Sequence, residues 1–204
     1  FSALVLTNVL YFMDGIDGIA ASQAILVTSA LIVLSGGRVL AIHLGLALIA
    51  SILGFLPFNF PRARIFLGDV GSGALGYALA LMIGISLATA QRTTWLLVLL
   101  PLSAFVLDAG LTLLSRALRG ERWWTPHVEH AYQRWARRTG DHRPVTAGYA
   151  VWTIAGGLGM AWFLGKDHRG MMMAVLAWLA MGSMIWYWLR RQPGIDGTEE
   201  RMGA

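Results

Sequence analysis

The sequence predicts an all-α, polytopic integral membrane protein with about six full transmembrane helices and part of another at its N-terminus. Of its 204 residues, 56% are apolar and only 13% are charged, whereas a soluble domain carries about 25% charged residues. The mean hydropathy is +0.60. Apolar stretches long enough to cross a bilayer, about 20 residues, recur along the chain. Lipid is therefore expected to be the main solvent of this protein.

The first element is expected to be the end of a span at 1–12, because the chain starts inside an apolar run without a basic segment or cleavage site before it. We expect 1–204 to form a single transmembrane domain and to be the C-terminal portion of a longer chain. Six further apolar stretches have the length of a span: 19–35, 39–56, 72–90, 95–115, 146–165 and 170–189. Cysteine is absent, which excludes thiolate metal sites.

The connecting segments must alternate between the two sides of the membrane, so their charges predict the orientation. Segments 13–18, 57–71 and 116–145 and the tail 190–204 share one side and carry twelve of the sixteen basic residues. The other side carries Arg38, Arg92, Lys166 and Arg169. Since positive charge is retained on the cytoplasmic side, the DGIDG turn, the two longer segments and the C-terminus are expected to be cytoplasmic.

Acidic residues gather on that same side. Asp14 and Asp17 lie in the turn DGIDG, Asp69 follows the third span, and Asp108 lies in the cytoplasmic half of the apolar run at 95–115. An ionisable residue in or beside a span is costly and usually faces a partner or a water-filled cavity. The clustering predicts a site at one face of the membrane.

The stretch FLGDVGSGALG formally matches a dinucleotide-binding glycine motif at 71–76, but no strand precedes it and position 92 is Arg instead of an acid. We reject that interpretation. Gly73 and Gly76 are also typical of a close-packing helix face. A bend through Gly68 and Gly71 into a helix at Ser72 would expose N–H groups that bind phosphate. Asp69 beside them favours a magnesium ion bridging carboxylate and phosphate.

The segment 116–145 is rich in arginine and aromatic residues and contains His127 and His130, three positions apart. On a helix these imidazoles share a face and could reach one ligand. An anionic substrate suits them better than zinc, which would need a third ligand. For the arginines alone, contact with anionic lipid headgroups is the favoured interpretation; for the histidine pair with Tyr132 and Gln133, a functional role is favoured.

Four motifs in this order carry a resemblance: YFMDGIDGIA, FNFPRARIFLGDVGSGALG, VLDAGLTLLSRALRGE with Asp108, and HVEHAYQR. The chain resembles the polyprenyl-phosphate N-acetylhexosamine-1-phosphate transferases, glycosyltransferase family 4, which includes phospho-MurNAc-pentapeptide translocase. The H-x-x-H-x-Y-Q-R form is similar to the branch that initiates O-antigen and other surface polysaccharides. The resemblance implies a multi-pass enzyme of the bacterial inner membrane that transfers an N-acetylhexosamine 1-phosphate from a UDP-sugar to undecaprenyl phosphate and releases UMP. Its partners would be these substrates and the bilayer, with no nucleic acid; a homodimer is left open.

The resemblance also implies roles for individual residues. Asp69 and Asp14 would bind Mg²⁺, for which Mn²⁺ is an alternative, and Asp17 would line the metal and nucleotide site. Phe66 would stack on uracil beside Asn59, and His127 and His130 would contact the sugar phosphate. Gly68, Gly71, Ser72 and Asp108 complete the expected substrate-binding set.

Two departures from the family pattern stand out. Tyr11 occupies the position where the family has Asn, three residues before the first Asp of the D-G-x-D-G motif. The family's paired aspartates belong to a part of the protein that precedes Phe1, so we expect this fragment to be incomplete for catalysis. The alternatives are an inactive relative and a transporter whose ion path uses the acidic residues.

Overall fold

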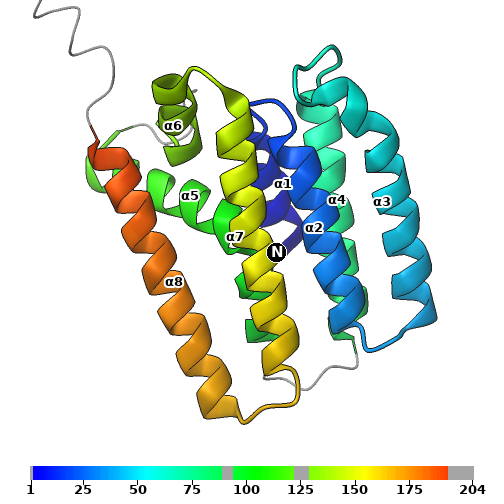
Figure 1. Ribbon diagram of the computed structural model, residues 1–204. Coiled ribbons are helices and arrows are strands. Elements are labelled where there is room, and N and C mark those ends of the chain that lie inside the picture. Colours follow the sequence, from blue (N-terminus) through cyan, green and yellow to red (C-terminus); the bar gives the residue numbers. More distant parts are fainter. Residues whose placement is uncertain (1, 89–93, 122–128, 193–204) are drawn as a thin grey trace, which may run out of the picture.

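The computed structural model describes residues 2–88, 94–121 and 129–192. These residues form α-helices and one short 3₁₀ helix, η1, in agreement with the predicted all-α class (Figure 1). The elements are α1 (Ser2–Met13), α2 (Ile19–Leu34), α3 (Val39–Asn59), α4 (Gly68–Leu87), η1 (Thr94–Val98), α5 (Leu99–Leu118), α6 (Ala131–Thr139), α7 (His142–Phe163) and α8 (His168–Arg191).

Four of the described helical segments are long and apolar enough to cross a membrane: α3, α4, η1 with α5, and α8. The apolar helix α2 has 16 residues, which at 1.5 Å per residue covers about 24 Å, less than a hydrocarbon core of about 30 Å. Helix α7 has 22 residues but begins with the polar sequence His142-Arg143-Pro144. We predicted six full spans; among the described residues, four helical segments have the length and composition of a span.

The helices lie side by side, and their connections alternate between two ends of the bundle (Figure 1). The DGIDG turn, the α3–α4 connection, α6 and the C-terminal end of α8 lie at one end, at the top of Figure 1. We call this the site end. The α2–α3 and α7–α8 connections lie at the other end. The predicted gathering of the acidic segments at one end is confirmed.

Helix α1 packs against α4, while α2 packs against α3 and α7. The α1–α4 contact depends on Gly76, where a Cβ atom would lie 2.5 Å from the Cα of Thr7 and 2.6 Å from the carbonyl oxygen of Leu6. Only glycine allows the two backbones to approach this closely. The packing interpretation of Gly76 is thus confirmed. The contact brings the end of α1, next to Asp14, beside the start of α4, which carries Asp69.

The segment expected as a connection at 116–145 is partly helical. Helix α5 continues to Leu118, α6 occupies Ala131–Thr139, and α7 begins at His142. The side chain of Asp141 accepts a hydrogen bond of 2.9 Å from the Arg143 N–H, which caps α7 at its first turn. This cap starts α7 earlier than the predicted span at 146–165, since hydropathy alone does not register a polar first turn.

Candidate active site

A cavity of about 250 Å³ opens at the site end between the end of α1, the DGIDG turn, the α3–α4 connection and the starts of α4 and α7. We call it the acidic cavity. It gathers seven of the residues predicted for the site: Asp14, Asp17, Asn59, Phe66, Gly68, Asp69 and Ser72. Tyr11, Gly15, Ile16, Leu67 and His142 complete its lining.

Asp14 and Asp69 face this cavity from two different elements. Asp69 belongs to the first turn of α4, and Asp14 directly follows α1. Burial, and then the negative charge of Asp69, raise the pKa of Asp14 to about 7. Two carboxylates that disfavour each other's charge are stabilised by a cation between them. The pair thus has the electrostatics of a divalent-cation site.

The number of protein ligands limits which cation the acidic cavity suits. Among the described residues, no group of three or more His, Cys, Asp or Glu side chains is placed to hold a metal ion together. Magnesium is commonly held by one or two carboxylates together with water and substrate phosphates. Asp14 and Asp69 fit that pattern, whereas a zinc site with three or four protein ligands does not.

Asp17 connects the DGIDG turn to two other segments. Its Oδ2 accepts a 3.2 Å hydrogen bond from the Ala63 N–H of the α3–α4 connection. Its carbonyl oxygen accepts a 2.9 Å hydrogen bond from Thr146 Oγ1 of α7. Asp17 therefore fixes the wall of the acidic cavity as well as facing into it.

His142, the first residue of α7, is a member of the site that the sequence did not identify. Its Nδ1 lies 3.3 Å from Asp17 Oδ2 and 3.4 Å from the Asp17 backbone nitrogen. The two residues are 125 positions apart in the sequence, so no spacing pattern links them. The available signal was a histidine after a capping aspartate, at the start of a helix that begins on the acidic side.

The rim of the cavity is formed by Asn59 and Phe66. The buried Asn59 side chain accepts from the Gly18 N–H at 3.0 Å and donates to the Ile65 carbonyl oxygen at 3.0 Å. These two hydrogen bonds of the Asn59 amide fix the conformation of the rim. The Phe66 ring is 74% exposed, so a planar ligand can stack on it.

Helix α4 begins at Gly68, four residues before the expected start at Ser72. This earlier start places Asp69 in the first helical turn, where N–H groups lack partners within the helix. Ser72 Oγ donates to the Asp69 carbonyl oxygen at 3.3 Å. Gly71 does not line the cavity; its Cα hydrogen faces the Leu67 side chain. The N–H groups without partners within the helix are those in the first turn of α4, which begins at Gly68.

Asp108 lies outside the acidic cavity and is 2% exposed. Its two oxygens accept hydrogen bonds from the backbone N–H groups of Ala131 (2.8 Å) and Tyr132 (3.0 Å), at the start of α6. Tyr149 donates its hydroxyl at 2.6 Å, and Trp186 its indole N–H at 3.2 Å. These contacts are those of a buried anchor, and a substrate-binding role for Asp108 stays a prediction.

The predicted histidine pair is described in part, because His127 lies outside the described residues. His130 is 1% exposed, with its Nδ1 3.7 Å from Asp108 Oδ1. Its ring centroid is 6.1 Å from that of Phe12. His130 is not among the residues that line the acidic cavity, and contact with a sugar phosphate remains a prediction for both histidines.

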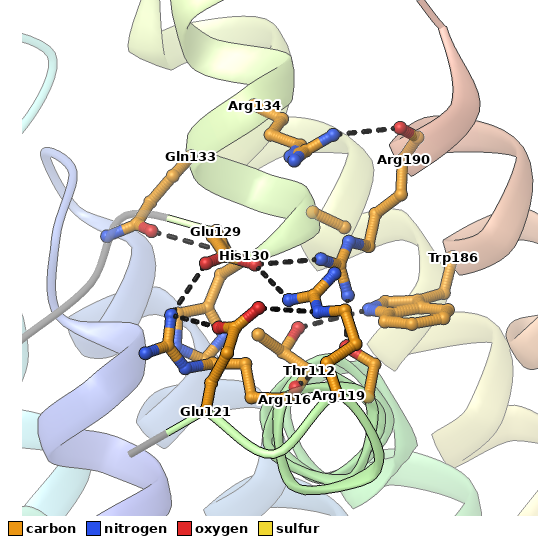
Figure 2. A network of polar contacts seen from close by, with 12 residues as sticks. Thr112, Arg116, Arg119, Glu121, Glu129, His130, Gln133, Arg134, Trp186 and Arg190 are labelled. Carbon is orange, nitrogen blue, oxygen red and sulfur yellow. Dashed lines mark hydrogen bonds and ion pairs between the residues drawn. The ribbon is translucent and has the colours of Figure 1, made fainter. Parts of the chain in front are cut away.

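The arginines near α6 form an ion-pair network with two glutamates (Figure 2). Glu129 accepts from Arg116 at 2.6 Å, Arg119 at 2.7 Å and Arg190 at 3.1 Å. Glu121 lies 3.2 Å from Arg116 and 2.6 Å from Arg119. For the arginines of 116–145 alone the sequence favoured lipid headgroups, but Arg116 and Arg119 contact protein carboxylates, as does Arg190 of α8. Their arrangement joins α5, the segment before α6 and α8.

A bundle of apolar helices with an acidic cavity at one end, beside a helix N-terminus, defines an all-α membrane protein. The sequence model of glycosyl transferase family 4 matches residues 1–89, which include Asp14, Asp17 and Asp69. This part of the chain belongs to that family, and two of the four sequence motifs, YFMDGIDGIA and FNFPRARIFLGDVGSGALG, lie within it.

Curated relatives extend the similarity further along the chain. A decaprenyl-phosphate N-acetylglucosaminephosphotransferase of Mycolicibacterium smegmatis is 30% identical over 95% of this chain and 53% of its own length. A probable undecaprenyl-phosphate N-acetylglucosaminyl 1-phosphate transferase of Bacillus subtilis is 36% identical over 63% of this chain and 37% of its own length. A phospho-N-acetylmuramoyl-pentapeptide-transferase of Symbiobacterium thermophilum is 38% identical over 54% of this chain and 33% of its own length. The chain thus spans about half or less of the relatives it matches.

Proposed function

We propose that the protein containing this chain transfers an N-acetylhexosamine 1-phosphate from a UDP-sugar to undecaprenyl phosphate and releases UMP. A phosphate oxygen of the lipid would attack the β-phosphorus of the nucleotide sugar, and the bond from that phosphorus to the UMP oxygen would break. The observation that carries the proposal is the acidic cavity, where Asp14 and Asp69 meet beside the start of α4. Phosphoryl transfer depends mainly on positioning and charge neutralisation, which these groups suit.

Asp14 and Asp69 would hold Mg²⁺, or Mn²⁺ in its place. When bound, the cation would neutralise charge on the pyrophosphate. The residues themselves support this assignment, because the neighbouring carboxylates disfavour their joint ionisation without a counter-charge. The N–H groups at the start of α4 would bind a phosphate oxygen next to the cation.

The remaining cavity residues would bind and orient the nucleotide. The exposed Phe66 ring would stack on uracil. Asp17 and His142 would hold the DGIDG turn against α7, which keeps Asp14 in place. Tyr11, 48% exposed on the cavity wall, would contribute a phenol where the family has an amide, and the nucleotide would meet a bulkier wall there.

We propose N-acetylglucosamine as the sugar and the start of a cell-envelope polysaccharide, of the O-antigen type, as the role. Relatives that match most of this chain are named for N-acetylglucosamine phosphotransfer. The protein would lie in the bacterial inner membrane with the site end in the cytoplasm, where nucleotide sugars are available. A transporter is disfavoured, since transport sites lie near the bilayer midplane and the acidic cavity lies at the end of the helices.

The test is UMP release by the full-length protein in nanodiscs with undecaprenyl phosphate, Mg²⁺ and either UDP-N-acetylglucosamine or UDP-MurNAc-pentapeptide. Activity with the first donor alone is expected. The variant Asp69→Asn should reduce release by at least about a hundredfold, the scale for loss of an electrostatic group at a reacting phosphate.

Asp167→Asn is the matched control, because Asp167 is also an acid at the start of a helix, α8, but at the opposite end of the bundle. Full activity of Asp69→Asn, or an equal loss in both variants, would overturn the proposed site. Activity with the pentapeptide donor alone would overturn the proposed sugar.

A further inference from the structure

The buried Asp108 carboxylate controls where α6 begins. It accepts both of the first backbone N–H groups of this helix, from Ala131 and Tyr132. Thr112, Tyr149 and Trp186, from α5, α7 and α8, donate side-chain hydrogen bonds to the same carboxylate. Because three packed helices hold Asp108 and Asp108 holds the helix start, the position of Tyr132 is fixed relative to the bundle.

Tyr132 connects the start of α6 to the DGIDG turn. The Tyr132 side chain is fully buried, and its hydroxyl donates a 3.0 Å hydrogen bond to the carbonyl oxygen of Phe12. Phe12 is two residues before Asp14. Burial and the charges of Asp108 and Asp14 raise the pKa of Tyr132, so the hydroxyl keeps its proton and remains a donor.

Gly15 shows how closely the tyrosine and the turn are fitted. A Cβ atom at Gly15 would collide with the Tyr132 hydroxyl and would lie 3.2 Å from Cζ of the same ring. The turn can therefore lie against the hydroxyl only because position 15 has no side chain. The Tyr132 hydroxyl donates to Phe12 before Asp14 and lies against Gly15 after it, which leaves Asp14 little freedom.

From these contacts we propose that Asp108 and Tyr132 are positioning residues, which through the start of α6 hold the DGIDG turn and thereby set the place of Asp14 in the acidic cavity. In this role they act through the turn and need no contact with substrate. The inference rests on the proposed function in so far as Asp14 is a metal ligand, but the coupling of Tyr132 to the turn can be measured without activity.

The first experiment measures backbone amide hydrogen exchange of residues 13–18 in the full-length protein in nanodiscs, without metal. Tyr132→Phe removes one hydroxyl-to-carbonyl hydrogen bond and keeps the ring. Exchange of the Asp17 and Gly18 amides should become about fivefold faster, the change expected from losing one typical net hydrogen bond. Asp108→Asn should have the same effect and also speed exchange at Ala131 and Tyr132, because its amide nitrogen would face N–H or O–H donors.

Ser86→Ala is the matched control, because Ser86 Oγ also donates a buried 3.0 Å hydrogen bond to a carbonyl oxygen, that of Leu31. It should leave exchange at 13–18 unchanged. Unchanged exchange in Tyr132→Phe, or equal changes in Tyr132→Phe and Ser86→Ala, would overturn the inference.

A rescue experiment keeps the inference testable if Asp108→Asn does not fold. Gly15→Ala alone should displace the turn and raise the Mg²⁺ concentration for half-maximal UMP release about tenfold. Gly15→Ala combined with Tyr132→Phe should recover part of this loss, because removing the hydroxyl makes room for the methyl group. Additive losses in the double variant would contradict the inference.

In the same double variant, the amides of residues 13–18 should exchange more slowly than in Gly15→Ala alone. This recovery does not depend on UMP release. If the exchange pattern holds and the parent protein shows no transferase activity, the proposed function fails while the coupling stands. If the transferase activity is present and exchange is unaffected, the positioning role fails alone.

Discussion

The substitution Glu129→Gln is expected to destabilise the attachment of α6 to the bundle. The Glu129 carboxylate lies within 3.1 Å of guanidinium nitrogens of Arg116, Arg119 and Arg190 (Figure 2). The side chains of Arg116 and Arg190 are only 8% and 10% exposed, whereas that of Arg119 is 46% exposed. The contact with Arg119 contributes little, and the two poorly exposed arginines determine the effect.

The magnitude follows from this difference in exposure. Removing one partner of a buried ion pair costs about 3–5 kcal/mol, and an exposed pair contributes about 0–1 kcal/mol. Glu129 is 26% exposed, and glutamine keeps one acceptor oxygen, so we expect a loss of about 2 kcal/mol. For a chain of this length that corresponds to a fall in melting temperature of about 4–8 °C.

The assay is thermal unfolding followed by tryptophan fluorescence in nanodiscs. Glu121→Gln is the matched control, because Glu121 contacts two of the same arginines but is 36% exposed; its melting temperature should fall by less than about 3 °C. Equal shifts in the two variants would refute the reasoning that burial of Arg116 and Arg190 decides the effect.

Three further predictions concern the turn, the helix packing and α7. In the metal-free protein, the native pKa of Asp14 is about 7, above its value of about 4 in the unfolded chain. Between these two pH values the native state binds more protons than the unfolded state. The free energy of unfolding should therefore fall as pH rises from about 4 to about 7. Thermal unfolding at several pH values should show this slope, and Asp14→Asn should flatten it. Gly76→Val should lower the yield of folded protein in size-exclusion chromatography, at a cost of about 3 kcal/mol, whereas Gly73→Ala, with 3.7 Å to the nearest atom, should be tolerated; equal yields would contradict the α1–α4 contact. His142→Ala should reduce UMP release about tenfold by loosening the DGIDG turn, with His168→Ala at the opposite end as the unaffected control.

The sequence allowed much of the acidic cavity to be predicted because its main residues lie at the ends of apolar runs. Asp14 and Asp17 end one such run, and Asp69 begins another. Alternation of the connections between two sides then puts these acids at the same end of the bundle, without any knowledge of packing. The close approach at Gly76 was predictable for a similar reason, since a small residue in an apolar helix has few other uses.

The parts that escaped prediction depend on contacts between distant segments. His142 meets Asp17 only because α7 begins beside the DGIDG turn, and the polar first turn of α7 obscured where this helix begins. Asp108 was expected in the site because a buried acid indicates function, but its oxygens are occupied by the start of α6. Neither contact produces a periodic pattern in the sequence, because each depends on the orientation of one helix relative to another.

The measurement that tests the central claim most directly is Mn²⁺ binding to the full-length protein, followed by electron paramagnetic resonance in the absence of substrate. We expect one site, weakened at least about tenfold in Asp14→Asn and in Asp69→Asn and unchanged in Asp167→Asn. Binding that is unaffected by both substitutions in the acidic cavity would contradict the assignment of Asp14 and Asp69 as the pair that holds the cation.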